Sequence, residues 1–207
     1  MTENIADLKY FFWRRLHSLL GILPIGVFLL EHFFSNSYVF QGPAAFNKIV
    51  ADLQGLPLVL LIEISLIAFP ILFHILLGLT ILYASKQNVL QYGTYRNWMY
   101  FLQRATGMIA VVFIGVHVYE TRLKALFADR LVTFDYMHQY FGPFWVKIFY
   151  VVGILSVVFH FANGISTSLI TWGITVSKRS QQMSAAVSWL VFVGMAVWGL
   201  KILYAFS

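Results

Sequence analysis

The sequence predicts an all-α protein, an integral membrane bundle of five transmembrane helices. Of its 207 residues, 60% are hydrophobic and only 11% are charged, and the mean hydropathy is +0.78. A soluble domain of this length has a much larger share of charged side chains. Apolar runs also recur along the whole chain, each reaching the ~20 residues needed to cross a ~30 Å hydrocarbon core. We therefore expect the lipid bilayer to surround this chain.

The predicted helices follow one another with short polar connections. In order, the apolar runs lie at residues 18–34, 56–84, 98–119, 144–176 and 183–206. Pro24 and Pro70 fall inside the first two runs, and a proline inside a helix removes a hydrogen bond and bends the axis. No linker or shift in composition interrupts the series, so residues 1–207 are expected to form a single transmembrane domain.

The positive charges predict the orientation in the membrane. The net charge is +6, but the cations lie at helix ends rather than in one basic stripe, which argues against a nucleic-acid partner. Of the 14 Lys and Arg, eight lie on the side of the N-terminus and six on the other side. Because cytoplasmic loops are enriched in Lys and Arg, the N-terminus is predicted to be cytoplasmic and the C-terminus to lie outside the cell membrane. Six of the cations on the predicted cytoplasmic face form a candidate docking surface: Arg14, Arg15, Arg96, Arg104, Lys178 and Arg179.

Four of the six histidines recur at nearly constant spacing inside the apolar runs. His32, His74, His117 and His160 are separated by 42, 43 and 43 residues. An α-helix rises ~1.5 Å per residue, so the position of a residue in its run gives its depth. On this scale His32 and His117 lie near the outer surface, and His74 and His160 near the inner surface. Equal depth thus pairs His32 with His117 and His74 with His160, at two levels ~15 Å apart.

These pairs predict two haems. A single intramembrane histidine is more often a hydrogen-bonding group between helices, but two at one level can fill both axial positions of a haem iron, which favours electron transfer. The chain has no cysteine, which excludes thiolate-held iron–sulfur clusters and covalent c-type haem. Zinc would need three or four ligands at one depth. We therefore predict two non-covalent b haems, an outer one held by His32 and His117 and an inner one held by His74 and His160. Gly78 and Gly164, four residues after the inner histidines, are expected to make room for the macrocycle.

Three carboxylates lie in or near apolar runs. Glu63 lies ~16 Å further out than the histidine of the same predicted helix, at the level of the outer pair. Intramembrane carboxylates often relay protons, and Glu63 is predicted to act catalytically by supplying protons to a quinone near the outer haem. Glu31 and Glu120 are expected to face an interfacial cation such as Arg122 or Lys124.

The remaining two histidines are expected at the membrane surface. His17 follows two arginines at the inner mouth of the first helix, with a contact to a haem propionate or a quinone as the alternative. His138 lies in an outer loop with Tyr136, Tyr140 and Phe141, an aromatic group typical of the interfacial belt.

Six segments spread over the whole chain carry a resemblance to a known family: FFWRRLHSLLG at 11–21, PILFHILLG at 70–78, RNWMYFLQRATG at 96–107, HVYETR at 117–122, FHFANG at 159–164 and TWGITVSKRSQ at 171–181. They resemble the di-haem cytochrome b membrane-anchor subunit of succinate:quinone oxidoreductases, in the single-subunit five-helix form of Gram-positive bacilli. In that family the first four helices supply four axial histidines, and His32, His74, His117 and His160 fall at the matching positions.

The resemblance implies an electron-transfer subunit of a succinate dehydrogenase or fumarate reductase, an enzyme complex of the respiratory chain and the tricarboxylic acid cycle. A flavoprotein subunit and an iron–sulfur subunit would dock on the cytoplasmic face, and electrons would pass through both haems to a quinone, expected to be menaquinone. The sequence shows no dicarboxylate site, flavin site or cluster ligands, so catalysis on succinate is expected on the other subunits. The alternative is a di-haem cytochrome b of another membrane dehydrogenase, such as a hydrogenase or formate dehydrogenase. A proton-coupled transporter is disfavoured, because no pair of broken helices marks a substrate site at the midplane.

Overall fold

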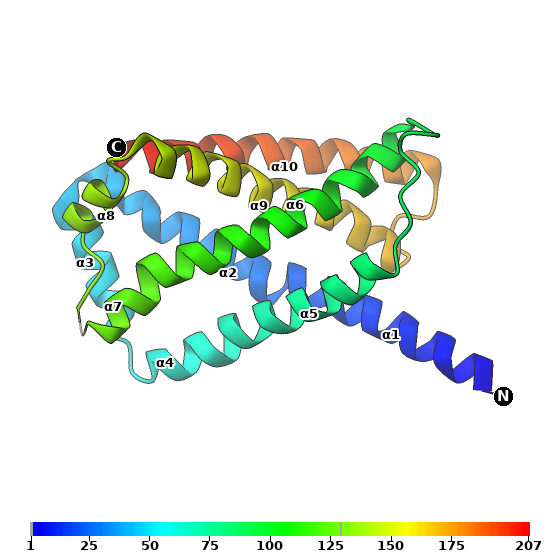
Figure 1. Ribbon diagram of the computed structural model, residues 1–207, viewed down its shortest axis with the longest axis horizontal. Helices are drawn as coiled ribbons and strands as arrows, with labels where there is room; N and C mark the ends of the chain where they lie inside the picture. Colours follow the sequence, from blue (N-terminus) through cyan, green and yellow to red (C-terminus); the bar gives the residue numbers. More distant parts are fainter. Residues whose placement is uncertain (1, 129) are drawn as a thin grey trace.

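Long helices lying side by side form an elongated bundle in the computed structural model, which describes residues 2–128 and 130–207 (Figure 1). Within these residues, five helical spans are long and apolar enough to cross a membrane: Phe11–Gln41, Val59–Tyr83, Tyr95–Phe127, Phe144–Thr171 and Lys178–Ala205. The same residues contain helices and no strand. The predicted all-α bundle of five spans is therefore confirmed, and each predicted run overlaps one span.

The helical segments, in chain order, are α1 (Thr2–Ile22), α2 (Pro24–Asn36), the 3-10 helix η1 (Ser37–Gln41), α3 (Pro43–Gln54), α4 (Val59–Ile62), the π-helix η2 (Glu63–Ala68), α5 (Phe69–Tyr83), α6 (Tyr95–Val118), the π-helix η3 (Tyr119–Leu123), α7 (Lys124–Phe127), α8 (Phe134–Tyr140), α9 (Phe144–Thr171) and α10 (Lys178–Ala205).

The first two spans change their helical geometry next to a proline. α1 ends at Ile22 and α2 begins at Pro24, and the hydrogen bonds from Leu23 N–H to Leu19 and from Val27 N–H to Leu23 carry the first span through this irregularity. In the second span the π-helical segment η2 ends at Ala68, and Pro70 lies in the first turn of α5. A proline inside a helical span removes one backbone hydrogen bond and disturbs the regular geometry of the turn before it. The two predicted irregularities therefore occur where the prolines stand.

The core of the bundle lies around α9. This helix packs against α6 and α10 along much of its length and also contacts α1. Its residue Val158 is fully buried, and Gly153 admits the ring of Phe113 from α6, since a Cβ there would stand 2.0 Å from a ring carbon. Ser184 of α10 donates to Ser166 of α9 at 3.0 Å. Small and hydroxyl-bearing residues at such contacts are typical of membrane bundles, where close packing replaces the hydrophobic effect.

The chain termini lie at opposite ends of the bundle, as an odd number of spans requires (Figure 1). The N-terminal end also carries the connections from α5 to α6 and from α9 to α10. The C-terminal end carries the short helices α3, α7 and α8.

Candidate functional site

The first histidine pair lies toward the C-terminal end. His32 of α2 and His117 of α6 have ring centroids 5.7 Å apart, with planes at 86°. Phe113 stacks on His117 at 5.6 Å, and the Nδ1 of His117 hydrogen-bonds with the hydroxyl of Tyr150 at 3.2 Å. The Nδ1 of His32 lies 3.4 Å from the amide nitrogen of Asn36. The structure thus brings together the outer pair predicted from depth.

The second histidine pair lies toward the N-terminal end. His74 of α5 and His160 of α9 have ring centroids 6.1 Å apart, with planes at 90°. The Nδ1–H of His74 donates to the carbonyl of His17 at 3.0 Å, and that of His160 to the carbonyl of Gln103 at 2.9 Å. The predicted inner pair is therefore also brought together, from the second and fourth spans.

The spacing of each pair fits one metal ion between two rings. Imidazoles on opposite sides of a metal, each at the ~2 Å bond length usual for metal–imidazole bonds, have ring centroids roughly 6 Å apart. Ligating histidines generally donate their other ring N–H to a carbonyl, carboxylate or water, as His74 and His160 do through Nδ1. Among the described residues no three His, Cys, Asp or Glu side chains form a group that could hold one metal ion. The four histidines predicted as ligands are therefore arranged as two pairs.

His17, expected at the inner mouth of the first helix, packs inside the bundle against His74. Its ring stacks on His74 with centroids 3.9 Å apart and planes at 13°, and its Nδ1–H donates to the carbonyl of His74 at 3.1 Å. A Cβ at Gly78 would stand 3.1 Å from the Cε1 of His17. The space at Gly78, expected for a macrocycle, is thus taken by the imidazole of His17. The pattern of a histidine followed by a glycine four residues later, shared by His17 and His74, was the sequence signal for this contact.

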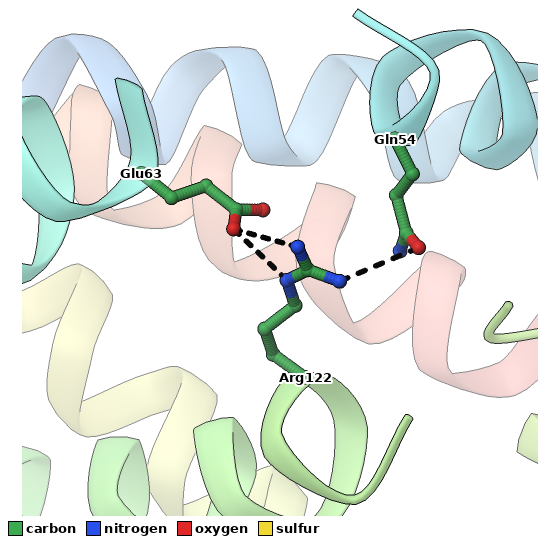
Figure 2. A network of polar contacts seen from close by, with 3 residues as sticks. All are labelled: Gln54, Glu63 and Arg122. Carbon is green, nitrogen blue, oxygen red and sulfur yellow. Dashed lines mark hydrogen bonds and ion pairs between the residues drawn. The ribbon is translucent and has the colours of Figure 1, made fainter. Parts of the chain in front are cut away.

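Glu63 forms an ion pair with Arg122 toward the C-terminal end (Figure 2). The Nη2 and Nε of Arg122 donate to one carboxylate oxygen of Glu63 at 2.7 and 3.0 Å, and its Nη1 donates to Gln54 at 3.4 Å. The side chains of Arg122 and Glu63 are 24% and 28% exposed, so the pair is half-buried. Both residues belong to π-helical segments, which occur frequently at functional sites. Arg122 follows His117 by five residues, which places the pair ~7 Å beyond the outer histidines along the helix.

The other two carboxylates have separate partners. Glu120 accepts from Lys124 at 2.6 Å, as expected for an interfacial carboxylate. Glu31 is exposed and accepts from the hydroxyl of Ser35 at 2.8 Å. Arg122, expected to face one of these two, instead pairs with Glu63.

His138 has a structural role at the C-terminal end. It lies in α8, where its ring stacks on Phe134 with centroids 6.0 Å apart. Its Nδ1–H donates to the carbonyl of Phe206 at 2.9 Å. This histidine therefore ties the short helix to the end of α10, away from both pairs.

Basic side chains gather at the N-terminal end, where His74 and His160 lie. Lys178 and Arg179 are exposed at the start of α10, and Arg96 at the start of α6 donates to Gln181. The guanidinium of Arg15 lies 5.1 Å from the ring of Trp172. The six cations of the predicted docking surface thus belong to α1, to the first half of α6 and to the start of α10, and both α6 and α10 begin at the N-terminal end (Figure 1).

The fold and the paired histidines define a multi-pass helical membrane protein with imidazole pairs inside the bundle at two levels. The model of the family described as "Succinate dehydrogenase/Fumarate reductase transmembrane subunit" matches residues 83–200, more than half of the chain. The chain is also 41% identical over 198 residues to the succinate dehydrogenase cytochrome b558 subunit of Bacillus subtilis (strain 168), with 96% of this chain and 98% of that protein covered. The chain therefore belongs to the succinate dehydrogenase and fumarate reductase transmembrane subunits, as the resemblance indicated. It is the membrane anchor subunit of a succinate dehydrogenase. Both comparisons therefore favour this enzyme complex over the alternative predicted from the sequence, a hydrogenase or formate dehydrogenase.

Proposed function

We propose that this anchor binds two b haems and conducts electrons through them from a cytoplasmic iron–sulfur subunit to a quinone in the membrane. The spacing of the two pairs, 5.7 Å for His32 with His117 and 6.1 Å for His74 with His160, carries the proposal. A haem with two axial histidines supplies a one-electron carrier without an open position for oxygen. The name of the Bacillus subtilis relative, a cytochrome b558 subunit, supports haem of the b type.

The residues around each pair hold the imidazoles ready for ligation. Hydrogen bonds to Nδ1 fix the orientation of His74 and His160 and leave Nε2 as the ligating nitrogen. His117 is held by the stacked ring of Phe113 and by a hydrogen bond between its Nδ1 and the hydroxyl of Tyr150. Because each pair joins two different spans, ligation also ties those spans together, so cofactor binding and bundle assembly are expected to be coupled.

The N-terminal end is proposed to face the cytoplasm, with the N-terminus inside and the C-terminus outside. The basic docking surface at this end supports binding of the iron–sulfur subunit and the flavoprotein subunit there. His74 and His160 lie at the same end, so the inner haem would be the first to receive electrons. On this proposal residues 1–207 act as one domain without a dicarboxylate catalytic site, and succinate is oxidised on the partner subunits.

The quinone, proposed to be menaquinone, is placed near the outer haem. A second haem is needed only if electrons must cross to the side of the membrane opposite the cytoplasm. The hydrogen-bonded side chains of Glu63, Arg122 and Gln54 lie toward that side, at the C-terminal end of the bundle. Quinone reduction consumes two protons, and Glu63 is proposed to relay them one at a time from the water on the outer side, with Arg122 compensating the charge of the carboxylate between transfers. Electrons moving toward the positive outside gain ~2.3 kcal/mol per charge per 100 mV for full transit, which would help to reduce a low-potential quinone.

The haem proposal is tested on the complex purified with its native partners. We expect two haems per chain, both extracted by acid acetone. Alanine variants of His74 and His160 should lose or perturb one spectral component, and those of His32 and His117 the other, whereas His138→Ala should retain both. A single haem per chain, or haem that resists extraction, would overturn the proposal. Loss of one common component in the His32 and His74 variants would overturn the pairing.

A further inference from the structure

The two helix hairpins that carry the inner histidines repeat the same reciprocal hydrogen bonds. In the first hairpin the Nδ1–H of His74 donates to the carbonyl of His17 at 3.0 Å, and the Nδ1–H of His17 donates to the carbonyl of His74 at 3.1 Å. In the second, the Nδ1–H of His160 donates to the carbonyl of Gln103 at 2.9 Å, and the Nε2 of Gln103 donates to the carbonyl of His160 at 3.0 Å. Both pairs are 57 residues apart in the chain. His17 and Gln103 thus make equivalent contacts.

Glycines at matching positions allow the inner imidazoles to approach the neighbouring helix. Gly21 follows His17 by four residues, and a Cβ on it would stand 2.8 Å from the Cε1 of His74. Gly107 follows Gln103 by four residues, and a Cβ on it would stand 2.9 Å from the Cε1 of His160. Any side chain at either glycine would have to push the imidazole aside.

A second pair of glycines lies on the helices that carry His74 and His160. These glycines face the side chains of His17 and Gln103. A Cβ on Gly78, four residues after the inner histidine of the first hairpin, would stand 3.1 Å from the Cε1 of His17. The matching Gly164 in the second hairpin would place its Cβ 3.6 Å from the Nε2 of Gln103. All four elements of the contact, two glycines and two polar side chains, therefore recur 86 residues later in the chain.

The outer pair is held by different contacts. His117 is bound through the hydroxyl of Tyr150, and His32 lies beside Asn36 of its own helix. The reciprocal hydrogen bonds are thus made by the inner histidines, His74 and His160. A substitution that removes them is expected to change the inner haem and not the outer one.

We propose that His17 and Gln103 are equivalent positioning residues, each of which fixes one inner histidine, His74 or His160, for ligation. This inference rests on the proposed haem binding by these two histidines. The ring of His17 lies 3.9 Å from that of His74, and the amide of Gln103 lies 3.3 Å from the Nδ1 of His160, so each side chain limits rotation of the imidazole. Each also binds the backbone carbonyl of its histidine, which holds the two helices in register. Because a glutamine performs this task in one hairpin, glutamine is expected to replace His17 in the other.

The experiment compares His17→Leu, His17→Gln, Gln103→Leu and Gln103→His in the whole membrane complex. Haem content, the low-temperature spectrum, the midpoint potential of each component and the rate of haem loss to an apo-protein acceptor are measured. Both leucine variants should lose the inner haem at least tenfold faster and shift its potential, because loss of a group that orients a ligand typically costs 10–100-fold in affinity. The outer component should not change. His17→Gln and Gln103→His should stay within about twofold of the parent rate, and the control His138→Leu should match the parent.

Each other outcome has a definite meaning. Leucine variants with an unchanged inner component would overturn the positioning role, and His17→Gln behaving like His17→Leu would overturn the equivalence. Equal changes in both components would show a general loss of stability and also overturn the proposal. If a leucine variant does not accumulate, Gln103→Glu decides, since it keeps the size but cannot donate to the carbonyl of His160. An unchanged inner component in Gln103→Glu refutes the inference. A parent complex without two haems would instead refute the proposed function.

Discussion

Gly107 of α6 lies directly beside the imidazole of His160 on α9, so that a Cβ on Gly107 would stand 2.9 Å from the Cε1 of that ring. Non-bonded carbon atoms at that separation must move apart. The distance between these two helices at the inner level therefore depends on the absence of a side chain at this position.

Gly107→Ala is expected to disturb the inner haem without unfolding the bundle. Alanine is the better helix former by about 1 kcal/mol, so α6 itself gains stability while the ring of His160 is displaced. The inner spectral component should be lost or shifted, and the helical circular dichroism should remain. The control is Gly115→Ala on the same helix, where a Cβ meets no atom within 4 Å and both components should persist. An unchanged inner component in Gly107→Ala would refute the argument.

Glu63→Gln should stop quinone reduction while leaving both haems in place. The amide cannot carry protons as a carboxylate does, although it still accepts a hydrogen bond from Arg122. We expect both haems to be reduced by succinate and quinone reductase activity to fall at least tenfold. Asp52→Asn is the matched control, because Asp52 pairs with exposed Lys48 at the surface, where an ion pair contributes little. Full turnover in Glu63→Gln would falsify the role of Glu63.

Reversing the charges of Lys178 and Arg179 should detach the soluble subunits. Both residues lie exposed in the first turn of α10, where negative side chains are favourable, so Lys178→Glu with Arg179→Glu is expected to fold. The partner subunits of the variant should be released from membranes, and at a lower salt concentration than those of the parent complex, because salt screens the remaining charge contacts. The haem spectrum of the anchor should stay the same. The control reverses Lys48 and Arg130 at the opposite end and should leave assembly intact. Wild-type assembly of the α10 variant would contradict the docking surface.

Gly153→Ala should destabilise the bundle at its centre. The new methyl group would overlap the ring of Phe113, and overpacking of this kind costs about 1–3 kcal/mol. Because Phe113 stacks on His117, the outer haem component should shift as well. Thermal unfolding in detergent together with the visible spectrum measures both effects. Gly194→Ala on α10, where a Cβ meets no atom within 4 Å, should be neutral or stabilising, and equal behaviour of the two variants would disprove the packing argument.

The depth of a residue along its helix could be predicted from the sequence, but the direction in which its side chain points from the helix axis could not. The rise per residue was sufficient to place His32 level with His117 and His74 level with His160. The partner of Glu63 depends instead on the direction in which its side chain leaves the axis. The π-helical segment η2 changes that direction, and no pattern in the sequence marked it. Of the two cations expected to face Glu31 and Glu120, Lys124 does pair with Glu120, whereas Arg122 pairs with Glu63.

The contact between His17 and His74 could not be predicted from the sequence for a related reason. The first apolar run predicted from the sequence begins at residue 18, because Arg14 and Arg15 precede it, whereas helix α1 continues through both arginines and His17. Arg15 lies against the rings of Phe11 and Trp172, so a cation is accommodated within the apolar span. Long cationic side chains near helix ends commonly behave in this way. The charge pattern consequently concealed a histidine that packs inside the bundle.

Glu63 and Arg122 lie in the two π-helical segments, whereas the paired histidines lie in regular α-helical turns. The direction of the charged side chains can therefore change without a change in the histidines. Removing one residue from η2 would restore α-helical pairing and turn Glu63 by about 100° around the axis. His74 lies after this segment and is held by its own contacts with His17, so it would stay where it is. A single-residue insertion or deletion during evolution could therefore create or abolish the Glu63–Arg122 pair while both imidazole pairs are inherited unchanged.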